Sequence, residues 1–462
     1  MTRIAVIGGG ISGLAAAWTL AERVPSAEVL VLEGSPAVGG KLRIGSIAGV
    51  SVDVGAEAML ARRPEAVELA REAGLGPELI APLTTSAQVR AGGALHPLPA
   101  RTMLGIPGDL DAARASGALT GVALERIGSE PGADPLAPLE DDVAVGALVR
   151  ARLGDEVTER LVEPLLGGVY AGRSDGLSLH ATMPALFGRL AGGGSLVRAV
   201  QGVVDQGTHN AASGPVFTSI TGGIGRLPQR LGSAGRFTVR TSTTVREIAR
   251  TPSGFRLTLG PVPDPEYVEA DAVIVATPAT KAAMLLREIA PAAAVELRAV
   301  ETASMAITTL AYRDVSLPPG SGVLIGAREG FAVKAVTICS QKWPLRTGGL
   351  LVLRASVGRA GEPQVLQRED AELVAIVRRD LRTLLGIRAE PVDSLVTRWG
   401  GGLPQYAVGH VERVARVRAA VAAVPGLAVC GATYDGVGIP ACIASATAAA
   451  DRVAGAPAAR GE

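Results

Sequence analysis

The start of the chain constrains its fold most strongly. An apolar run at residues 4–7 predicts a buried parallel strand, and the alanine-rich segment 14–20 predicts the helix that follows it. Between them lies a turn of the form Gly8-x-Gly10-x-x-Gly13. In such a turn the first glycine permits the sharp bend, the second lets the backbone approach a pyrophosphate, and the third lets helix and strand pack closely. The pattern predicts a βαβ unit that places an anionic group at a helix N-terminus.

An acidic residue completes this pattern. A second apolar run, 29–32, ends in Glu33, whose carboxylate can accept hydrogen bonds from both ribose hydroxyls of an adenosine and argues against a 2′-phosphate. A lone GxGxxG is common, but here the strand, the glycines, the helix and the acid occur in the required order. We therefore predict dinucleotide binding; the alternative is an ordinary βαβ unit.

Length and composition limit the function classes. A chain of 462 residues predicts two or three domains, and Lys+Arg 45 against Asp+Glu 44 gives no reason to expect nucleic acid. Three widely separated cysteines and four histidines predict reduced, buried thiols and no metal site. The N-terminal apolar run reads as a strand rather than a signal peptide, and no apolar stretch reaches the length of a membrane span. We expect a cytoplasmic protein whose membrane association is absent or at most peripheral.

A second glycine pair follows the acid, at Gly39 and Gly40, with Lys41 and Arg43 after it. Adjacent glycines let the backbone run against phosphates or ribose, and a basic side chain adds charge complementarity. A plain surface turn is the alternative. A GG-R/K element just past the ribose-binding acid is typical of flavoproteins with two dinucleotide-binding modules, and NAD dehydrogenases lack it.

Strand-and-glycine patterns return near 217–275 and again near 427–438, where a glycine turn opens an alanine-rich helix and would bring a second helix dipole to the cofactor. We therefore predict an α/β fold: a discontinuous Rossmann-like FAD-binding domain, an α+β substrate domain and a helical insertion. The expected segments are 1–62, 206–288 and 425–462 for the FAD-binding domain, 63–100 and 289–424 for the substrate domain, and 101–205 for the insertion.

The motifs together resemble those of the protoporphyrinogen/coproporphyrinogen oxidases of haem synthesis. From residue 4 to about 452 the chain carries, in order, GGGISG, VGGKL, DVGAEA, GGVYAGRSDGLSL, TGGIG, DAVIVATP, QKWP, RWGGGLPQYAVGH and GATYDGVGIPACI. The resemblance implies an amine-oxidase-type flavoprotein that binds FAD and removes six electrons from a porphyrinogen. Each round begins with hydride transfer to flavin N5, and molecular oxygen reoxidises the flavin to give hydrogen peroxide. The protein's part is to hold the macrocycle over the flavin and exclude competing reactions.

The resemblance also implies roles for individual residues. The pyrophosphate would be held by Gly8, Gly9, Gly10, Ile11, Ser12 and Gly13, and the ribose by Glu33. The flavin would be lined by Lys41, Gly55, Ala56, Glu57, Ala58 and Trp399, and its ring would meet Val437, Gly438 and Ile439 at a helix start. The backbone of Val245 would reach the adenine, and Gly34, Gly40 and Ala276 complete the expected cofactor-binding set. Gly168 matches the glycine whose backbone faces the substrate in family members.

Substrate choice and catalytic side chains stay open. Eukaryotic relatives have a propionate-pairing arginine where this chain has Ser86-Ala87-Gln88, with Arg90 nearby, so propionate recognition has no assigned residue. In its soluble, alanine-rich composition the chain resembles the actinobacterial and other Gram-positive members of the family. This resemblance favours coproporphyrinogen III over protoporphyrinogen IX as the substrate. A flavin amine oxidase or desaturase-like enzyme would share the cofactor domain, and so would a flavin-free binding module that kept the fold. Contact with the next haem-pathway enzyme is a further expectation. No catalytic side chain is predicted. Tyr170, Lys342 and Tyr406 are candidates either for a catalytic role or for a purely structural role in packing.

Overall fold

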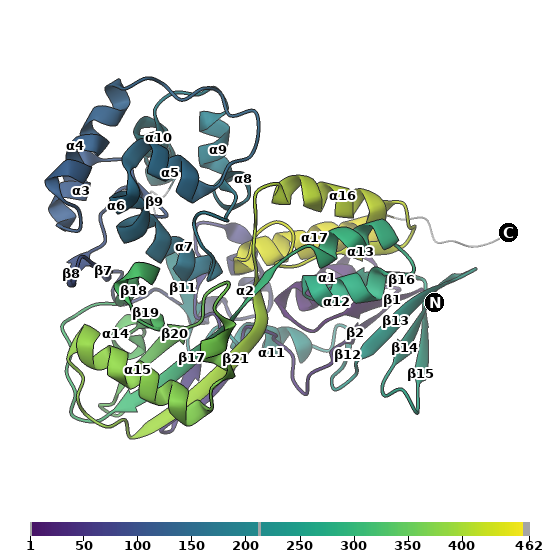
Figure 1. Cartoon of the computed structure of the whole chain (residues 1–462). Coiled ribbons are helices and arrows are strands. Elements are labelled where there is room, and N and C mark those ends of the chain that lie inside the picture. Colours follow the sequence, from purple (N-terminus) through teal and green to yellow (C-terminus); the bar gives the residue numbers. More distant parts are fainter. Residues whose placement is uncertain (1, 211–213, 456–462) are drawn as a thin grey trace.

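The computed structural model describes residues 2–210 and 214–455. Three parts are visible in Figure 1: a parallel sheet with its helices on the right, a seven-stranded sheet at the lower left, and a group of helices at the upper left. The chain passes between them repeatedly, so the first part is built from the beginning, middle and end of the sequence.

The first part is a five-stranded sheet in which every neighbouring pair is parallel. Its strands, in spatial order, are β12 (Thr238–Arg240), β2 (Glu28–Leu32), β1 (Arg3–Ile7), β16 (Ala272–Val275) and β22 (Leu427–Val429). Parallel sheets are covered on both faces, which is why these strands are continuous apolar runs rather than alternating ones. In β1, Ile4 and Val6 enter one core, whereas Ala5 and Ile7 enter the other.

Helices and a small sheet cover these two faces. The first face carries α1 (Ile11–Arg23), α2 (Pro64–Glu72), α11 (Arg226–Gly232) and α17 (Ile439–Ala454). The second face carries an antiparallel sheet, β13 (Val245–Thr251), β14 (Gly254–Leu259) and β15 (Glu266–Ala270), with the helices α12 (Ala279–Leu286), α13 (Pro291–Arg298) and α16 (His410–Ala422). Helices α13 and α16 thus share the core of the parallel sheet, although both fall within the 289–424 segment that we assign to the substrate domain.

The second part is a mixed sheet of seven strands. Its order is β21 (Asp393–Pro404), β17 (Thr302–Tyr312), β20 (Leu351–Val357), β19 (Val333–Thr337), β18 (Gly322–Ile325), β7 (Ala87–Ala91) and β8 (Ala94–Pro97). The contact of β18 with β7 is parallel, and the other pairs are antiparallel. Helix α15 (Asp370–Leu385) covers one face through Val377, Leu381 and Leu384. The short helix α14 (Cys339–Lys342) follows β19.

The third part is helical and has its own apolar core. It contains α3 (Leu110–Ser116), α4 (Gly121–Ser129), α5 (Val145–Leu153), α6 (Asp155–Val157), α7 (Glu163–Tyr170), α8 (Leu179–Thr182), α9 (Pro184–Leu190) and α10 (Leu196–Asn210). A π-helical turn, η3 (Thr158–Val162), joins α6 to α7. Turns of π-helix are rare in proteins overall, and those that do occur are often located at functional sites. The sequence pattern predicts a helix over 156–165, and the π turn within it is not visible in that pattern.

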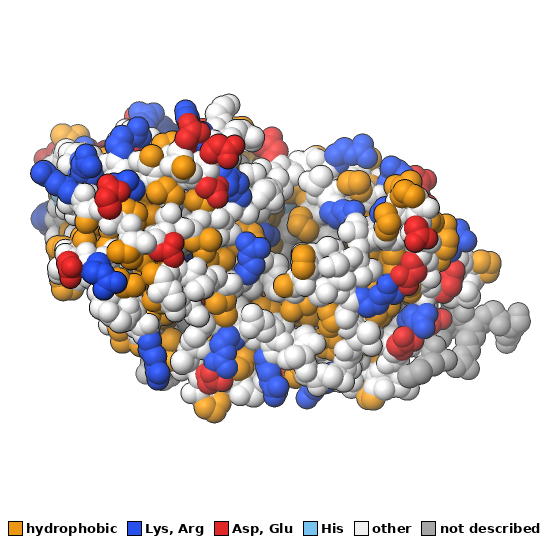
Figure 2. Space-filling view, turned by 90° about the horizontal axis from the view of Figure 1, so that it is seen from below, with side chains coloured by type: hydrophobic (Ala, Val, Ile, Leu, Met, Phe, Trp, Pro, Cys, Tyr) orange, Lys and Arg blue, Asp and Glu red, His pale blue; other side chains and the backbone are white. Residues whose placement is uncertain are grey.

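Short elements connect the three parts. They are the hairpin β3 (Ile44–Ile47) and β4 (Val50–Asp53), the strands β5 (Met59–Leu60), β6 (Leu79–Ile80) and β11 (Phe217–Ile220), the pair β9 (Thr102–Met103) and β10 (Ile106–Pro107), and the 3-10 turns η1 (Gly76–Glu78), η2 (Glu130–Gly132), η4 (Ala327–Glu329) and η5 (Pro363–Gln367). On the face shown in Figure 2, basic and acidic side chains are interspersed. Within residues 2–210 and 214–455, no helix is both long enough and apolar enough to cross a membrane.

Candidate functional site

The glycines of the first turn are fixed by close backbone packing. A Cβ on Gly13 would lie 1.8 Å from the Gly8 carbonyl oxygen, and Gly8, at φ +111°, lies against Ala276, whose carbonyl oxygen would be 2.8 Å from a Gly8 Cβ. A Cβ on Gly10, by contrast, would meet no atom within 4 Å. Gly8 and Gly13 therefore serve the packing of strand and helix, whereas Gly10 borders open space in front of the helix, as a pyrophosphate requires.

Glu33 is held beside this turn by two backbone donors. The Gly9 N–H donates to Glu33 Oε2 at 2.5 Å, and the Ser35 N–H donates to Glu33 Oε1 at 2.7 Å. The Thr243 N–H donates to the Glu33 carbonyl at 2.8 Å, and a Cβ on Gly34 would lie 3.2 Å from Thr244 Oγ1. Val245 follows directly, so the segment expected at the adenine does lie alongside the acid expected at the ribose.

The second glycine pair lies against the first turn. The Gly39 N–H donates to the Gly9 carbonyl at 2.8 Å, and a Cβ on Gly40 would be 3.3 Å from the Gly10 Cα. The next residue, Lys41, has its pKa lowered by burial, while the Cys442 thiol acts in the opposite direction. Cys442 belongs to the first turn of α17, so Lys41 lies near the start of that helix.

Two helices begin at this place without capping side chains. Neither α1, which starts at Ile11, nor α17, which starts at Ile439 after Gly438, has an acidic residue in its first turn or a side-chain cap. Ser12 lies beside Gly431, where a Cβ would be 3.5 Å from Ser12 Oγ. Two free helix N-termini and a lysine therefore converge on the open space next to Gly10. This is a favourable environment for phosphate groups and for a partial negative charge.

A second tight contact brings the DVGAEA segment to Lys41. The Ala56 N–H donates to the Lys41 carbonyl at 3.1 Å, and a Cβ on Gly55 would be only 1.8 Å from that oxygen. The Trp399 Nε1–H donates to the Val54 carbonyl at 3.0 Å, and the Arg43 guanidinium lies 4.9 Å from the Trp399 ring centroid. The residues expected to line the flavin are thus assembled from three distant stretches of chain.

Glu57 has a more specific position than the sequence indicates. Its carboxylate, on a side chain that is 14% exposed, accepts hydrogen bonds from Lys342 Nζ at 2.5 Å and from Arg354 Nη1 at 3.0 Å. Arg354 Nη2 also donates to the Gly55 carbonyl at 2.5 Å. Burial raises the pKa of Glu57, but the two cations outweigh it and the net pKa is lowered. The carboxylate therefore ties β20 and α14 of the substrate domain to the Gly55 turn, and only the backbone of Glu57 is free to line a cofactor.

This cluster could not be recognised as a unit from the sequence, where Glu57 and Lys342 are separate candidates and Arg354 gives no signal. Lys342 and Arg354 are 285 and 297 positions from Glu57 along the chain, so no local spacing links them. The QKWP motif, which contains Lys342, is the one sequence signal that could have indicated the Glu57–Lys342–Arg354 cluster.

A cavity of about 40 Å³ lies beside the cluster, bordered by Asp53, Glu57, Ser219, Cys339 and Arg354. Its lining is mostly apolar, but the polar side chains of these five residues and its size suit a bound water molecule. Asp53 Oδ2 accepts from the Ile224 N–H at 2.9 Å and Oδ1 from the Gly225 N–H at 3.1 Å. Burial nevertheless raises the pKa of Asp53 to about 6.

This pKa shift gives a pH-dependent stability. Because the folded-state pKa of Asp53 is above its ordinary value, protonation favours the folded state, and this contribution is present at low pH and lost as the pH rises through about 6. Relative to Asp53→Asn, which cannot titrate, the wild-type free energy of unfolding should fall by about 3 kcal/mol at most between pH 4 and pH 6. Urea unfolding at a series of pH values measures this difference, and parallel pH profiles for the two proteins would contradict it.

The GGVYAG and LPQY motifs meet at the boundary of the helical part. The rings of Tyr170 and Tyr406 are 5.6 Å apart, and Tyr406 is stacked on His410 at 4.1 Å. The Tyr406 hydroxyl donates to the Ala432 carbonyl at 2.5 Å, next to the turn that leads to Val437. Burial raises the pKa of Tyr170 to about 12, so its phenol stays neutral near pH 7. These side chains join the helical core to the C-terminal turn.

Gly168, the expected substrate-facing residue, is exposed on α7. A Cβ there would lie 3.3 Å from Leu324 Cδ2 on β18. Val437, just before α17, packs against the helical core. Gly168 therefore borders the seven-stranded sheet, and the start of α17 borders the helical part.

The ribose assignment can be tested at Glu33. Glu33→Ala removes a charged acceptor, so the affinity for the expected flavin dinucleotide should fall by about tenfold or more. Equilibrium dialysis or loss of flavin absorbance on dilution measures the change. The matched control is Glu28→Ala at the other end of β2, where the carboxylate pairs with Arg3 at 2.9 Å. Equal FAD affinity of the Glu33 variant and the wild type would reject the assignment.

The whole arrangement fits a dinucleotide that extends from Glu33, across Gly10 between two helix starts, to the Gly55 turn. Comparison with known proteins agrees: residues 11–454 match the flavin containing amine oxidoreductases. The chain belongs to this family. It is therefore a flavin-dependent oxidoreductase, and the fold class predicted from the sequence is confirmed.

Relatives within the family are similar over almost the whole chain. The coproporphyrinogen III oxidase of Mycobacterium tuberculosis is 37% identical over 447 residues, which cover 96% of this chain and 95% of the relative. That of Bacillus subtilis is 33% identical over 461 residues, 96% of each chain. A solved structure from Exiguobacterium sp. 255-15, named for protoporphyrinogen oxidase, has a TM-score of 0.86 at 33% identity and covers 98% of both chains. The resemblance to the protoporphyrinogen/coproporphyrinogen oxidases is confirmed.

Proposed function

We propose that this flavoenzyme oxidises coproporphyrinogen III to coproporphyrin III in haem synthesis, with FAD as its cofactor and molecular oxygen as the electron acceptor. The observation that carries the proposal is the match of almost the whole chain to relatives named coproporphyrinogen III oxidase. Gly168 lies against Leu324 of the seven-stranded sheet, and Val437 packs against the helical core. The substrate name is transferred from those relatives.

FAD, when bound, supplies a two-electron acceptor, and the six-electron oxidation then takes successive rounds. The chain's own residues bind the cofactor and orient it relative to the substrate. Glu33 would hold the adenosine ribose, and Gly10 and the start of α1 would hold the phosphates. The start of α17 would meet the flavin ring, and Lys41 would add a positive charge near the flavin. The Glu57–Lys342–Arg354 cluster fixes the Gly55 turn against the substrate domain.

The protein's contribution to the chemistry is positional rather than acid–base. The two tyrosines at the junction, Tyr170 and Tyr406, have pKa values raised by burial, and neither side chain is poised to exchange a proton near pH 7. A site that positions the macrocycle and excludes water suffices, since the hydride acceptor belongs to the cofactor.

Protoporphyrinogen IX is the alternative substrate, because the protoporphyrinogen oxidase of Bos taurus is 29% identical over 492 residues. A cytoplasmic location and transfer of the product to the next haem-pathway enzyme are part of the proposal. Amine oxidation has less support, since putrescine oxidase structures share the fold at only 17% identity and a TM-score of 0.70.

The experiment is an aerobic assay with the FAD-loaded enzyme and coproporphyrinogen III. Porphyrin fluorescence should appear, with one hydrogen peroxide formed for each pair of electrons removed. Porphyrin formation without peroxide would reject oxygen as the acceptor. A purified protein that contains no flavin and cannot be reconstituted with it would reject the whole proposal.

A further inference from the structure

Two buried cations lie on the seven-stranded sheet without a carboxylate partner. Lys334 in β19 is 2% exposed and Arg359, after β20, is 8% exposed. Among residues 2–210 and 214–455, the Lys334 amine has no hydrogen-bond partner, and the Arg359 guanidinium donates to the carbonyls of Phe331 at 3.2 Å and Ile325 at 3.4 Å. Burial, and then the nearby Arg359 guanidinium, lower the pKa of Lys334 to about 7. A buried, unpaired amine beside a second cation is costly unless an anion joins them.

The acidic groups around Arg359 are engaged elsewhere. Asp380 accepts from the Ala332 N–H at 2.9 Å and the Val333 N–H at 3.1 Å. Glu163 and Glu362 both pair with Arg173. Within the described part of the chain, neither Lys334 nor Arg359 forms an ion pair.

The two cations border the helix that carries Gly168. Leu324, the residue nearest to a Cβ on Gly168, pairs in the sheet with Ala335, the neighbour of Lys334. The Ala360 N–H, next to Arg359, donates to the carbonyl of Ala171 at the end of α7 at 2.7 Å. Because Gly168 has no side chain, the Leu324 side chain lies directly against the α7 backbone at this position.

We propose that Lys334 and Arg359, next to the contact of α7 with strands β18 and β19, form a binding site for a carboxylate of the substrate, one propionate of the porphyrinogen. This inference rests on the proposed function for the identity of the ligand. The site itself follows from the two unpaired cations. A carboxylate there would accept from the Lys334 amine and pair with the Arg359 guanidinium, which satisfies both groups.

The first test measures binding of the oxidised product, coproporphyrin III, to the FAD-loaded protein. Quenching of the porphyrin fluorescence reports the binding. Lys334→Met should weaken binding by about tenfold or more, since it removes one charge-assisted hydrogen bond. Lys334→Arg should bind closer to the wild type. In turnover, KM for coproporphyrinogen III should rise in Lys334→Met while kcat changes much less.

A second readout separates binding from a structural role. Because the unliganded amine titrates near pH 7, the wild type should take up a proton when it binds coproporphyrin III near that pH, and Lys334→Met should lose this uptake. Calorimetry in buffers of different ionisation enthalpy measures it. If Lys334→Met is poorly folded, Lys334→Gln serves for the same measurements.

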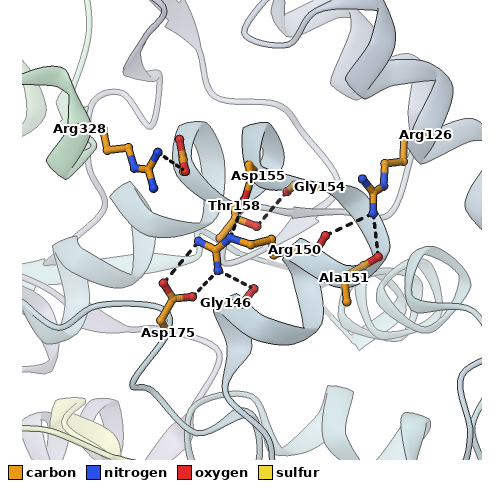
Figure 3. Close-up of polar contacts among 10 residues, drawn as sticks. Arg126, Gly146, Arg150, Ala151, Gly154, Asp155, Thr158, Asp175 and Arg328 are labelled. Atoms are coloured by element: carbon orange, nitrogen blue, oxygen red, sulfur yellow. Dashed lines mark hydrogen bonds and ion pairs between the residues drawn. The ribbon is translucent and has the colours of Figure 1, made fainter.

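The control is Arg328→Met on the loop between the same strands. Arg328 is exposed and pairs with Glu159 of the π turn at 2.9 Å, as the contact drawn at Arg328 in Figure 3 shows. This variant should bind and turn over as the wild type does. Unchanged product affinity and KM in a folded Lys334→Met protein would overturn the inference. A wild type that binds coproporphyrin III with proton uptake but oxidises no porphyrinogen would instead reject the proposed function and leave the carboxylate site supported.

Discussion

Gly13→Ala should yield a protein that retains no flavin and is strongly destabilised. The new Cβ would lie 1.8 Å from the Gly8 carbonyl oxygen and 3.4 Å from Ala276 Cβ, both in the buried start of the parallel sheet. Because these are backbone and core atoms, the whole β1–α1 turn has to move, and the cost should be about 3 kcal/mol or more. Thermal unfolding and the flavin absorbance of the purified protein measure both effects.

Two further alanine substitutions separate packing from ligand contact. Gly10→Ala places a Cβ in open space, so the apo-protein should unfold near the wild-type temperature, whereas FAD affinity should fall because the cofactor comes close there. Gly121→Ala, at the exposed start of α4 with nothing within 4 Å, should change neither property. Normal flavin retention in Gly10→Ala would contradict the position assigned to the pyrophosphate.

The second large effect is expected at Glu57. Glu57→Ala removes the common partner of Lys342 and Arg354 and leaves two partly desolvated cations beside each other. Loss of one partner of a buried ion pair costs about 3–5 kcal/mol. The Gly55 turn loses its fixed neighbour at the same time, so FAD affinity should fall as well. Urea unfolding of the apo-protein and flavin titration measure the two consequences.

Glu288→Ala, which breaks an ion pair on the surface, is the control for Glu57→Ala. Its carboxylate pairs with Arg287, and both side chains are more than half exposed. Such pairs contribute about 1 kcal/mol or less. If Glu57→Ala were no more destabilising than Glu288→Ala, the cluster would not hold the two domains together as the geometry indicates.

Much of the architecture could be predicted from local patterns. Apolar runs such as 4–7 and 29–32 are strands because both faces of a parallel sheet are buried, and glycines such as Gly13 reveal where the backbone packs too closely for a side chain. The strand-then-glycine pattern recurs at β16 and β22, so the discontinuous sheet could be recognised too.

Site residues could be predicted from the sequence in two cases only. In one, the backbone of a glycine turn forms the site, and in the other a single side chain follows such a turn at a fixed distance along the chain. Glu33 is such a side chain, and the structure places it at Gly9. The Glu57 cluster fits neither case, because its partners come from strands and helices nearly 300 residues away. Lys334 gives no signal either: a lysine in a strand normally faces solvent, whereas Lys334 lies at a register shift between Val333 and Ala335 and is buried. Packing between distant elements, which no local pattern encodes, decides these positions.

Oxidation of coproporphyrinogen III by the bound flavin can be observed by anaerobic mixing of the FAD-loaded enzyme with coproporphyrinogen III and, separately, with protoporphyrinogen IX. Flavin absorbance near its visible maximum should bleach as electrons are transferred, and faster with coproporphyrinogen III. Admission of oxygen should then restore the absorbance and permit porphyrin fluorescence to develop. A flavin that protoporphyrinogen IX alone reduces, or that neither porphyrinogen reduces, would contradict the account.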